Sequence, residues 1–189
     1  MYSKYVKRII DLVLAVLIMI VLIIPMSIIA LISKISTNDS VIFCQVRSGV
    51  HRKPFVLYKY RTMPSDVSPN IPTSQYNDIE ELNGWQRFLR KTSLDELPQL
   101  FNIIKSDMSF IGPRPVICAE TDLIEVREKY GANDIKPGLT GWAQVNGRDC
   151  LDAEEKAKLD GEYVKKQSFL FDCKCFFMTI GTVFTDKGL

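Results

Sequence analysis

The feature that most constrains this chain is a run of 21 residues, 12–32, without a charged side chain: LVLAVLIMIVLIIPMSIIALI. A transmembrane α-helix needs about 20 apolar residues, so the run is long enough to cross a bilayer. It is longer than the apolar part of a typical secretory signal, and no A-x-A-like cleavage site follows it. The run therefore predicts that the N-terminal segment holds this protein in a membrane.

Two features leave open whether this helix spans the bilayer or re-enters on the same side. Pro25 lies in the middle of the run, where it removes a backbone hydrogen bond and should kink the helix. Basic residues flank both ends, and the positive-inside rule places such flanks in the cytoplasm. A helix with both ends on one side must turn back within the bilayer. The flanking cations are Lys4, Lys7 and Arg8 before the run and Lys34 and Arg47 after it.

The charge distribution divides the chain into a membrane helix, residues 1–36, and a domain with the composition of an ordinary water-soluble protein, residues 37–189. The first part has four cations and one acid, a net charge of +3, and the whole chain is +2, so residues 37–189 sum to −1. A nucleic-acid-binding domain should be strongly basic, so nucleic acid is not an expected partner. The positive charge lies beside the apolar run, where anionic lipid headgroups would be.

Cysteine and histidine usage excludes two other kinds of chemistry. The five cysteines form no CxxC pair, which favours reduced thiols in a cytosolic setting over a metal or disulfide framework. The only histidine, His51, lies in the turn-like stretch SGVHRKPF, so a Ser-His or Cys-His nucleophile is not expected. The cysteines are Cys44, Cys118, Cys150, Cys173 and Cys175.

The remaining sequence predicts an α+β fold, a mostly helical domain with a short β-hairpin. Residues 41–61 have β-branched and aromatic runs around a turn at Ser48-Gly49, and Pro54 opens the second strand. Five cations on this hairpin indicate either a solvated or headgroup-facing surface or a site for phosphates. They are Arg47, Arg52, Lys53, Lys59 and Arg61. Residues 64–80 read as a loop. Helices are expected over 82–90, from about 93, over 119–130 and in two pieces from 151, the last of which is aromatic enough for the core or a membrane interface.

The stretch KTSLDELPQL places two adjacent acids, Asp95 and Glu96, before a proline. Ser93 and Glu96 have the spacing of a capping box, in which each side chain satisfies a free backbone N–H at a helix start. On this spacing alone a helix cap is the commoner explanation, and a catalytic pair is the alternative. Farther on, the prolines around Arg114 hold that residue in a stiff, extended backbone, which suits a guanidinium that binds an oxyanion.

Several motifs follow in one order: KRIIDL, the apolar run with Pro25, FCQVRSG, KPFVLYKYRTM, LRKTSLDELPQL, DMSFIGPRP and KPGLTGWAQVNGRD. Together they resemble the bacterial sugar transferases, the small monotopic phosphoglycosyl transferases that begin capsule, O-antigen and glycoprotein glycan assembly. The resemblance runs over nearly the whole chain. It departs from the family at the helix break, where many relatives have Ser-Pro and this chain has Ile24-Pro25. Ser27 is left to satisfy a freed carbonyl.

The resemblance implies a reaction and an architecture. A UDP-sugar would give its sugar-1-phosphate to undecaprenyl phosphate and release UMP, with Mg²⁺ as the cofactor. A re-entrant, Pro-kinked helix and interfacial amphipathic helices would hold the enzyme on the cytoplasmic face of the bacterial inner membrane, where downstream glycosyltransferases are possible partners. The family's Asp-Glu pair falls on Asp95 and Glu96, which reverses the preference for a helix cap.

The physics of phosphoryl transfer suggests a role for each candidate residue. A carboxylate that attacks a diphosphate is repelled by it, so surrounding cations must neutralise the phosphates. Adjacent acids point about 100° apart around a helix, which favours two different roles. Our hypothesis is that Asp95 is the nucleophile, forming an aspartyl phosphosugar, and that Glu96 binds metal with it or accepts a proton. The candidate phosphate ligands are Arg90, Arg114 and Arg148, with Lys59 and Arg61.

Two other classes of function are alternatives to catalysis. A non-catalytic, membrane-anchored interaction module of a glycan-assembly complex is the first, but a degenerate transferase should have lost one of the motif residues, and none is missing. A phosphate-lipid binding protein is the second, for which adjacent acids beside an anionic ligand would be a liability. The sequence does not identify the sugar, which we expect residues 64–80 and 116–135 to select.

Overall fold

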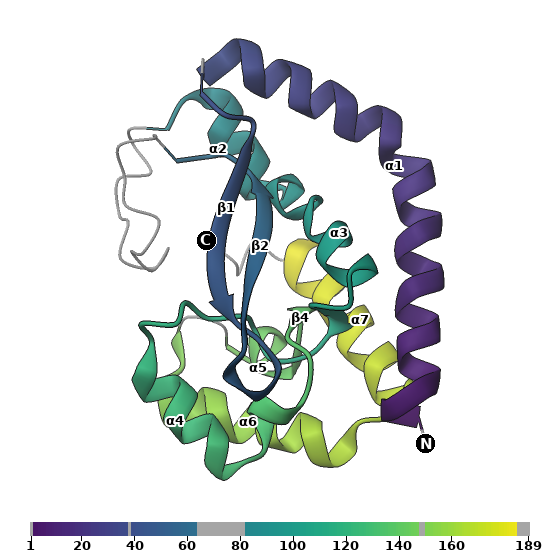
Figure 1. The fold of residues 1–189 in the computed structure, drawn as a ribbon, viewed down its shortest axis with the longest axis vertical. Coiled ribbons are helices and arrows are strands. Elements are labelled where there is room, and N and C mark those ends of the chain that lie inside the picture. Colours follow the sequence, from purple (N-terminus) through teal and green to yellow (C-terminus); the bar gives the residue numbers. More distant parts are fainter. Residues whose placement is uncertain (1, 38, 64–81, 148–149, 185–189) are drawn as a thin grey trace.

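The computed structural model describes residues 2–37, 39–63, 82–147 and 150–184, and these form the predicted α+β fold (Figure 1). A π-helical turn, η1 (Tyr2–Val6), leads into the long helix α1 (Lys7–Thr37), and a β-hairpin follows. Most of the remaining chain is helical. In order, its elements are α2 (Gly84–Lys91), η5 (Leu94–Glu96), α3 (Gln99–Ile104), β3 (Ser109–Ile111), α4 (Thr121–Lys129), η6 (Ala132–Asp134), β4 (Gly138–Thr140), α5 (Trp142–Val145), α6 (Ala153–Lys166) and α7 (Phe169–Phe184).

The hairpin forms where the sequence predicts it. Strands β1 (Ile42–Ser48) and β2 (Pro54–Tyr60) pair antiparallel, and Pro54 opens the second strand as expected. Their connection contains the short 3₁₀ turn η2 (Val50–Arg52), in which His51 and Arg52 both have positive φ. Strand β2 turns the side chains of Leu57 and Tyr60 into the core. The hairpin thus has one face on the protein and a reversal that reaches toward η6.

A second, parallel pair of strands was not predicted. Strand β3 lies beside β4, with Ser109 opposite Gly138 and Ile111 opposite Thr140. Three-residue strands are too short to show a period-2 pattern, which is why the sequence does not indicate them.

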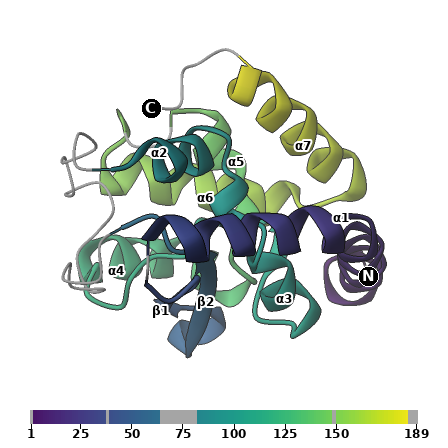
Figure 2. The same cartoon turned by 90° about the horizontal axis from the view of Figure 1, so that it is seen from above.

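Helix α1 bends and lies along the rest of the molecule, as the two views in Figures 1 and 2 show. Its inner face packs through Ala15 and Met26 against Leu100 and Ile103 of α3. Pro25 lies inside the helix, in agreement with the expected kink. The Ser27 hydroxyl donates to the carbonyl of Ile23 at 2.7 Å. That carbonyl is not the one Pro25 leaves unpaired, which belongs to the residue four positions before it.

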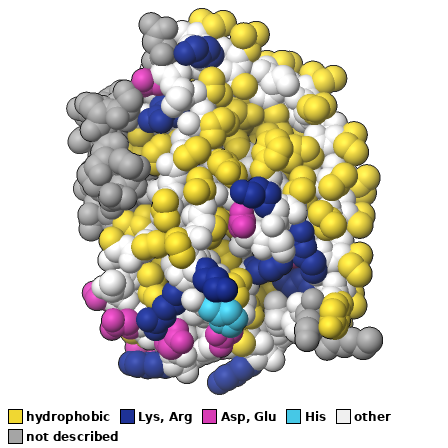
Figure 3. Space-filling view, in the orientation of Figure 1, with side chains coloured by type: hydrophobic (Ala, Val, Ile, Leu, Met, Phe, Trp, Pro, Cys, Tyr) yellow, Lys and Arg dark blue, Asp and Glu magenta, His cyan; other side chains and the backbone are white. Residues whose placement is uncertain are grey.

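The outer face of α1 is apolar and exposed. Val21, Ile24 and Ile35 are among its most exposed side chains, at 74%, 70% and 76%. Figure 3 shows hydrophobic side chains along the edge of the molecule that α1 forms. Among the described residues, α1 is the one helix long and apolar enough to cross a membrane, judged by length and composition.

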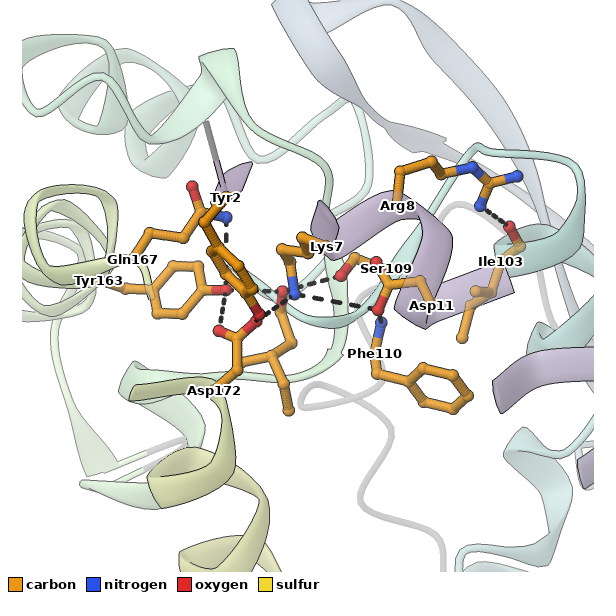
Figure 4. A network of polar contacts seen from close by, with 11 residues as sticks. Tyr2, Lys7, Arg8, Asp11, Ile103, Ser109, Phe110, Tyr163, Gln167 and Asp172 are labelled. Atoms are coloured by element: carbon orange, nitrogen blue, oxygen red, sulfur yellow. Dashed lines mark hydrogen bonds and ion pairs between the residues drawn. The ribbon is translucent and has the colours of Figure 1, made fainter. Parts of the chain in front are cut away.

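The N-terminal end of α1 is fastened by buried polar contacts (Figure 4). Lys7 Nζ lies 2.7 Å from Asp172 Oδ2 on α7, and both residues are buried. Tyr163 donates to Asp172 Oδ1 at 2.6 Å, and burial raises the pKa of this tyrosine, which keeps it a neutral donor. Arg8 donates to the carbonyls of Ile103 at 2.6 Å and Ile104 at 2.9 Å. Lys7 therefore faces the protein interior, and the expectation that it lies among lipid headgroups is wrong.

Three glycines allow the backbone around β3 and β4 to come together. A Cβ on Gly138 would lie 2.1 Å from the Gly112 nitrogen and 2.4 Å from the Thr140 carbonyl oxygen. A Cβ on Gly141 would lie 2.0 Å from the Gly112 carbonyl oxygen. All of these neighbours are backbone atoms, so a side chain here must displace the chain rather than a flexible group.

We expect Gly138→Ala to destabilise the fold by at least about 1–3 kcal/mol, the usual cost of overpacking a close contact. The melting temperature should then fall by several degrees, at about 2–4 °C per kcal/mol for a chain of this size. Gly84→Ala is the matched control, because a Cβ on Gly84 meets no atom within 4 Å. Equal melting temperatures for the two variants would contradict the close backbone approach.

Candidate active site

The two adjacent acids lie in the 3₁₀ turn η5, between α2 and α3. The capping box expected from Ser93 and Glu96 is absent: Ser93 has φ 55° and its side chain makes no capping hydrogen bond. Its carbonyl instead accepts from the Glu96 N–H at 3.2 Å and closes the turn. Capping boxes occur at α2 and α6 instead. Backbone geometry, rather than a reciprocal cap, presents the two acids.

The environment of Asp95 is unusual for a carboxylate. Its residue is 8% exposed, and burial, the largest influence, raises the pKa of Asp95 to about 6. Lys59 and Arg90 oppose this effect, while Glu96 adds to it. At neutral pH the carboxylate is still mostly ionised, but its weak solvation leaves it more basic than a surface aspartate. A perturbed carboxylate of this kind is a feature of functional sites.

Lys59 connects the acids to the hairpin. It projects from β2, and its Nζ lies 2.7 Å from Glu96 Oε1 and 3.9 Å from Asp95 Oδ2. Arg90, near the end of α2, donates through Nε to Thr62 Oγ1 at 3.0 Å and lies close enough to Asp95 to lower its pKa. The structure therefore brings four of the sequence-predicted site residues together around η5.

A small, open pocket lies next to these residues. Arg114 shares its lining with Lys59 and Glu96, although Arg114 comes from a distant part of the sequence and its side chain is exposed. Asp95 is not part of this lining, but its carboxylate lies 3.9 Å from the Nζ of Lys59, which is. The lining consists of Arg47, Leu57, Lys59, Glu96, Gln99, Arg114, Pro115, Gly138 and Leu139.

Of the other predicted site residues, Arg61 makes contacts elsewhere and Arg148 has no described position. Arg61, just beyond β2, donates to the carbonyl and hydroxyl oxygens of Ser40 and lies over the Phe43 ring at 5.5 Å. These contacts place it at the start of β1, away from η5. Arg148 lies outside the described residues, so its predicted role as a phosphate ligand is not tested.

Two residues of the pocket were missed by the sequence reasoning. Arg47 is buried on β1, and burial followed by the nearby Arg114 lowers the pKa of Arg47 to about 10. Gln99 opens α3, three residues after Glu96, and is also buried. Arg47 had been treated as one of several hairpin cations, and only its place in the motif FCQVRSG could have distinguished it. Gln99 lies within the motif LRKTSLDELPQL but carries no charge to mark it.

The carboxylates around η5 suit a hard cation whose remaining ligands come from the substrate. No group of three or more His, Cys, Asp or Glu side chains with metal-binding geometry occurs among the residues the structure describes. Asp95 and Glu96 supply two carboxylates, and Mg²⁺ commonly binds through one or two carboxylates together with substrate phosphates. The residues present therefore fit Mg²⁺ better than a metal held entirely by protein ligands, such as structural zinc.

Comparison with known proteins identifies the family. The chain matches the bacterial sugar transferase family over residues 2–186. It is 40% identical over 158 residues to the uncharacterised sugar transferase EpsL of Bacillus subtilis, covering 82% of this chain and 76% of that protein.

Two relatives with assigned reactions are longer. The UDP-glucose:undecaprenyl-phosphate glucose-1-phosphate transferase of Escherichia coli is 38% identical, covering 98% of this chain and 42% of that protein. The undecaprenyl-phosphate galactose phosphotransferase of Salmonella typhimurium is 33% identical over the same shares of the two chains. The chain thus spans about two fifths of these two relatives. On the family match over nearly its whole length, this chain belongs to the bacterial sugar transferase family.

Proposed function

We propose that this chain is a phosphoglycosyl transferase that moves a sugar-1-phosphate from a UDP-sugar to undecaprenyl phosphate and releases UMP, as a first membrane step of glycan assembly. The observation that carries the proposal is a poorly solvated carboxylate, Asp95, next to a pocket with three cations, Arg47, Lys59 and Arg114. The names of the relatives at 38% and 33% identity support the same reaction.

The chemistry that this geometry supports best is a double displacement. A carboxylate oxygen of Asp95 attacks the phosphorus that bears the sugar, the bond to the UMP oxygen breaks, and UMP leaves with that oxygen and its charge. A phosphate oxygen of undecaprenyl phosphate then attacks the same phosphorus and releases the Asp95 carboxylate. Burial keeps the nucleophile poorly hydrated, and the neighbouring cations offset the repulsion between carboxylate and diphosphate.

The other residues of the site hold charge and protons. Arg114 is proposed to bind the diphosphate, with Arg90 as a further cation near the nucleophile. Glu96, 2.7 Å from Lys59, would accept the proton of the incoming prenyl phosphate or help to bind metal. Asp95 and Glu96 are the residues that would hold Mg²⁺, and the ion would supply further neutralisation of phosphate charge.

UMP release measures the proposed reaction directly. The full-length protein in lipid nanodiscs with Mg²⁺ should release UMP from at least one member of a UDP-sugar panel, and sustained release should require undecaprenyl phosphate. A non-catalytic interaction module would release none with any donor. A phosphate-lipid binding protein would bind the prenyl phosphate without UMP release, which a lipid-binding measurement in the same nanodiscs would detect.

The rate should depend on pH in a way that reports Asp95. Because the nucleophile must be ionised, kcat/KM measured at limiting Mg²⁺, where the free enzyme carries no metal, is expected to fall about tenfold per pH unit below about pH 6, the pKa of Asp95 in the metal-free protein. Lys59 lowers that pKa, so Lys59→Met should move the acid limb to higher pH in addition to reducing the rate. A limb that stays in place in Lys59→Met would show that it belongs to another group.

The re-entrant arrangement of α1 is part of the proposal. Near the C-terminal end of α1, Ser33 accepts from Trp85 Nε1 at 2.9 Å, and the Met26 carbonyl accepts from the Tyr60 hydroxyl at 2.8 Å. The other end is fastened to Asp172. A straight helix of 31 residues would be about 46 Å long, and a helix that spans the bilayer cannot keep both ends on the same domain. These contacts support a bent helix inserted from one side.

Helix α7 offers a second apolar surface for the membrane interface. Its exposed large side chains lie seven residues apart (169 and 176, 170 and 177) or three and four apart (177 and 176 to 180), so they share one face, while Asp172 and Cys175 turn inward. Such a face suits a helix lying in the headgroup region, and the sequence had left core and interface both open. The exposed residues are Phe169, Leu170, Phe176, Phe177 and Ile180.

Cysteine labelling tests the side of each end of α1. In a background without the five native cysteines, Ser3→Cys and Ser36→Cys, both at exposed positions, should resist an impermeant maleimide in spheroplasts and react after lysis. A single-cysteine protein that retains the exposed Cys44 reports the side of the catalytic domain. Opposite accessibility of positions 3 and 36 would mean that the helix spans the bilayer.

A further inference from the structure

The loop that carries Arg114 has an unusual set of hydrogen bonds. Each of four consecutive carbonyls, from Pro113 to Val116, accepts a hydrogen bond from a group outside the loop. The Gly138 N–H donates to Pro113 at 2.8 Å, and the Ser48 N–H donates to Val116 at 2.9 Å. The two carbonyls between them accept from side chains. Pairing of all four carbonyls fixes the position of the loop backbone from several sides.

Both of these side chains are buried arginines. Arg127 NH1 donates to the Arg114 carbonyl at 3.0 Å, and Arg47 NH1 donates to the Pro115 carbonyl at 3.2 Å. Arg127 belongs to α4 and Arg47 to β1, and they are 5% and 7% exposed. The Arg114 side chain, in contrast, is exposed and lines the pocket beside Glu96.

The two buried guanidinium groups are used in the same way. In Arg127, Nε and NH2 bind Asp160 Oδ2 on α6 at 2.8 Å and 2.7 Å, which leaves NH1 for the loop. In Arg47, Nε and NH2 bind Gln45 Oε1, which again leaves NH1 for the loop. A guanidinium has five donors in a fixed plane, so one edge can be anchored while the other donates. A lysine ammonium lacks this geometry.

The loop needs such donors because of its own sequence. Pro113 and Pro115 have no N–H, so this segment cannot pair with a neighbouring strand along its length. Glycines at 112 and 138 let the backbones approach on one side, and the arginines hold the other carbonyls. The loop would otherwise keep only its two outer hydrogen bonds.

We propose that Arg127, fixed by Asp160, and Arg47 are positioning residues that set the location of the Arg114 guanidinium. This inference rests on the proposed function, in which Arg114 binds the donor diphosphate. Arg127 does not line the pocket by Glu96, so its influence on the reaction passes through the Arg114 backbone. Asp160, 1% exposed, acts one step farther away.

A double-mutant cycle tests the inference. The paired change Arg127→Gln with Asp160→Asn removes both charges together, so that no buried charge is left without a partner. In the native background it should lower kcat/KM for the UDP-sugar by about 10–100-fold, the size expected from small misplacement of a binding group. In the Arg114→Ala background the same pair of changes should lower it less than about twofold.

Two further variants keep the experiment decisive. Tyr130→Phe is the matched control, because it removes the hydroxyl that donates to Glu154 at 2.6 Å and joins the end of α4 to α6, while it keeps the ring that packs against the cluster containing Val116. Its kcat/KM should stay within about twofold of the native value. Arg127→Lys retains a charge beside Asp160 and serves if the paired variant does not fold; it should show the same dependence on Arg114.

Amide hydrogen exchange gives a readout that does not depend on activity. Peptides containing Val116 and Ile117 should exchange faster in the Arg127 variants and at the native rate in Tyr130→Phe. Native protection in the Arg127 variants would overturn the inference. So would an equal loss of kcat/KM in both Arg114 backgrounds, which would mean that Arg127 acts on overall stability. If Arg114→Ala alone leaves kcat/KM unchanged, the proposed role of Arg114 fails instead.

Discussion

Asp95→Asn is expected to reduce UMP release by on the order of 10³-fold or more, because an amide of the same size cannot form the aspartyl phosphosugar. Rapid-quench experiments with a sugar-labelled donor and no undecaprenyl phosphate provide the direct measurement. Native protein should become labelled within one turnover, and Asp95→Asn should not. Labelled Asp95→Asn protein, or normal turnover by it, would exclude the double displacement.

The same substitution should raise stability, which separates loss of chemistry from loss of structure. The pKa of Asp95 is about 6 in the folded protein against 3.8 for an ordinary aspartate. Between these values the folded state binds more protons than the unfolded state, so the free energy of unfolding decreases as pH rises through this window. Above pH 6 the ionised, buried carboxylate destabilises the fold, and the neutral amide does not.

At pH 7.5 and without divalent cations we therefore expect Asp95→Asn to melt several degrees higher than the native protein, at about 2–4 °C per kcal/mol. Below about pH 4 the difference should disappear. Glu96→Gln is the control, because it removes the charge that contacts Lys59 at 2.7 Å and should not raise the melting temperature. A lower melting temperature for Asp95→Asn would mean that the carboxylate is structural.

Local patterns in the sequence predicted local structure well, and distant contacts poorly. The hairpin, α4 and the two-part C-terminal region follow from alternation, turn residues and helical periodicity. The pairing of β3 with β4 depends on glycines at 112 and 138 that let two backbones meet. The salt bridge between Lys7 and Asp172 joins residues 165 positions apart. No local pattern contains either contact.

The candidate site shows the same division. The adjacent acids are visible in the sequence, but their spacing from Ser93 suggested a helix cap that the left-handed Ser93 backbone does not allow. The proximity of Lys59 depends on how the hairpin packs against η5, and the sequence indicated it only through a family resemblance. Arg47 and Gln99 are identified as residues of the candidate site by the three-dimensional pocket that they line.

The packing of α1 explains how the acids could be held at a fixed depth. Leu97, directly after the acids, packs against the same core clusters as Met26 and Ile29 of α1. In the proposed reaction, undecaprenyl phosphate presents its phosphate only at headgroup level, so the distance between α1 and the proposed nucleophile, Asp95, matters. Because α1 packs in the same core clusters as Leu97, it determines that distance better than a flexible tether would.

Lys7→Met should be among the most destabilising single substitutions, since it leaves Asp172 buried and charged without its partner. Breaking a buried pair in this way costs about 3–5 kcal/mol, which corresponds to a melting temperature lower by about 10 °C. Lys166→Met is the matched control: Lys166 pairs with Glu162 at 3.2 Å on the surface of α6, and such pairs contribute about 0.3–0.5 kcal/mol.

A second substitution separates the buried charge from the lost contact. Lys7→Met combined with Asp172→Asn removes both charges of the 2.7 Å pair, and the Tyr163 hydroxyl can still donate to the amide oxygen at position 172. Asp11, 3.9 Å from Lys7 Nζ and also buried, keeps its charge, so part of the lost stability should return. Thermal unfolding in nanodiscs at pH 7.5 gives the melting temperatures of the native protein, the two single variants and the double variant. If Lys7→Met melts no lower than Lys166→Met, the N-terminal end of α1 is not fastened to α7, and the argument for insertion from one side loses one of its two anchors.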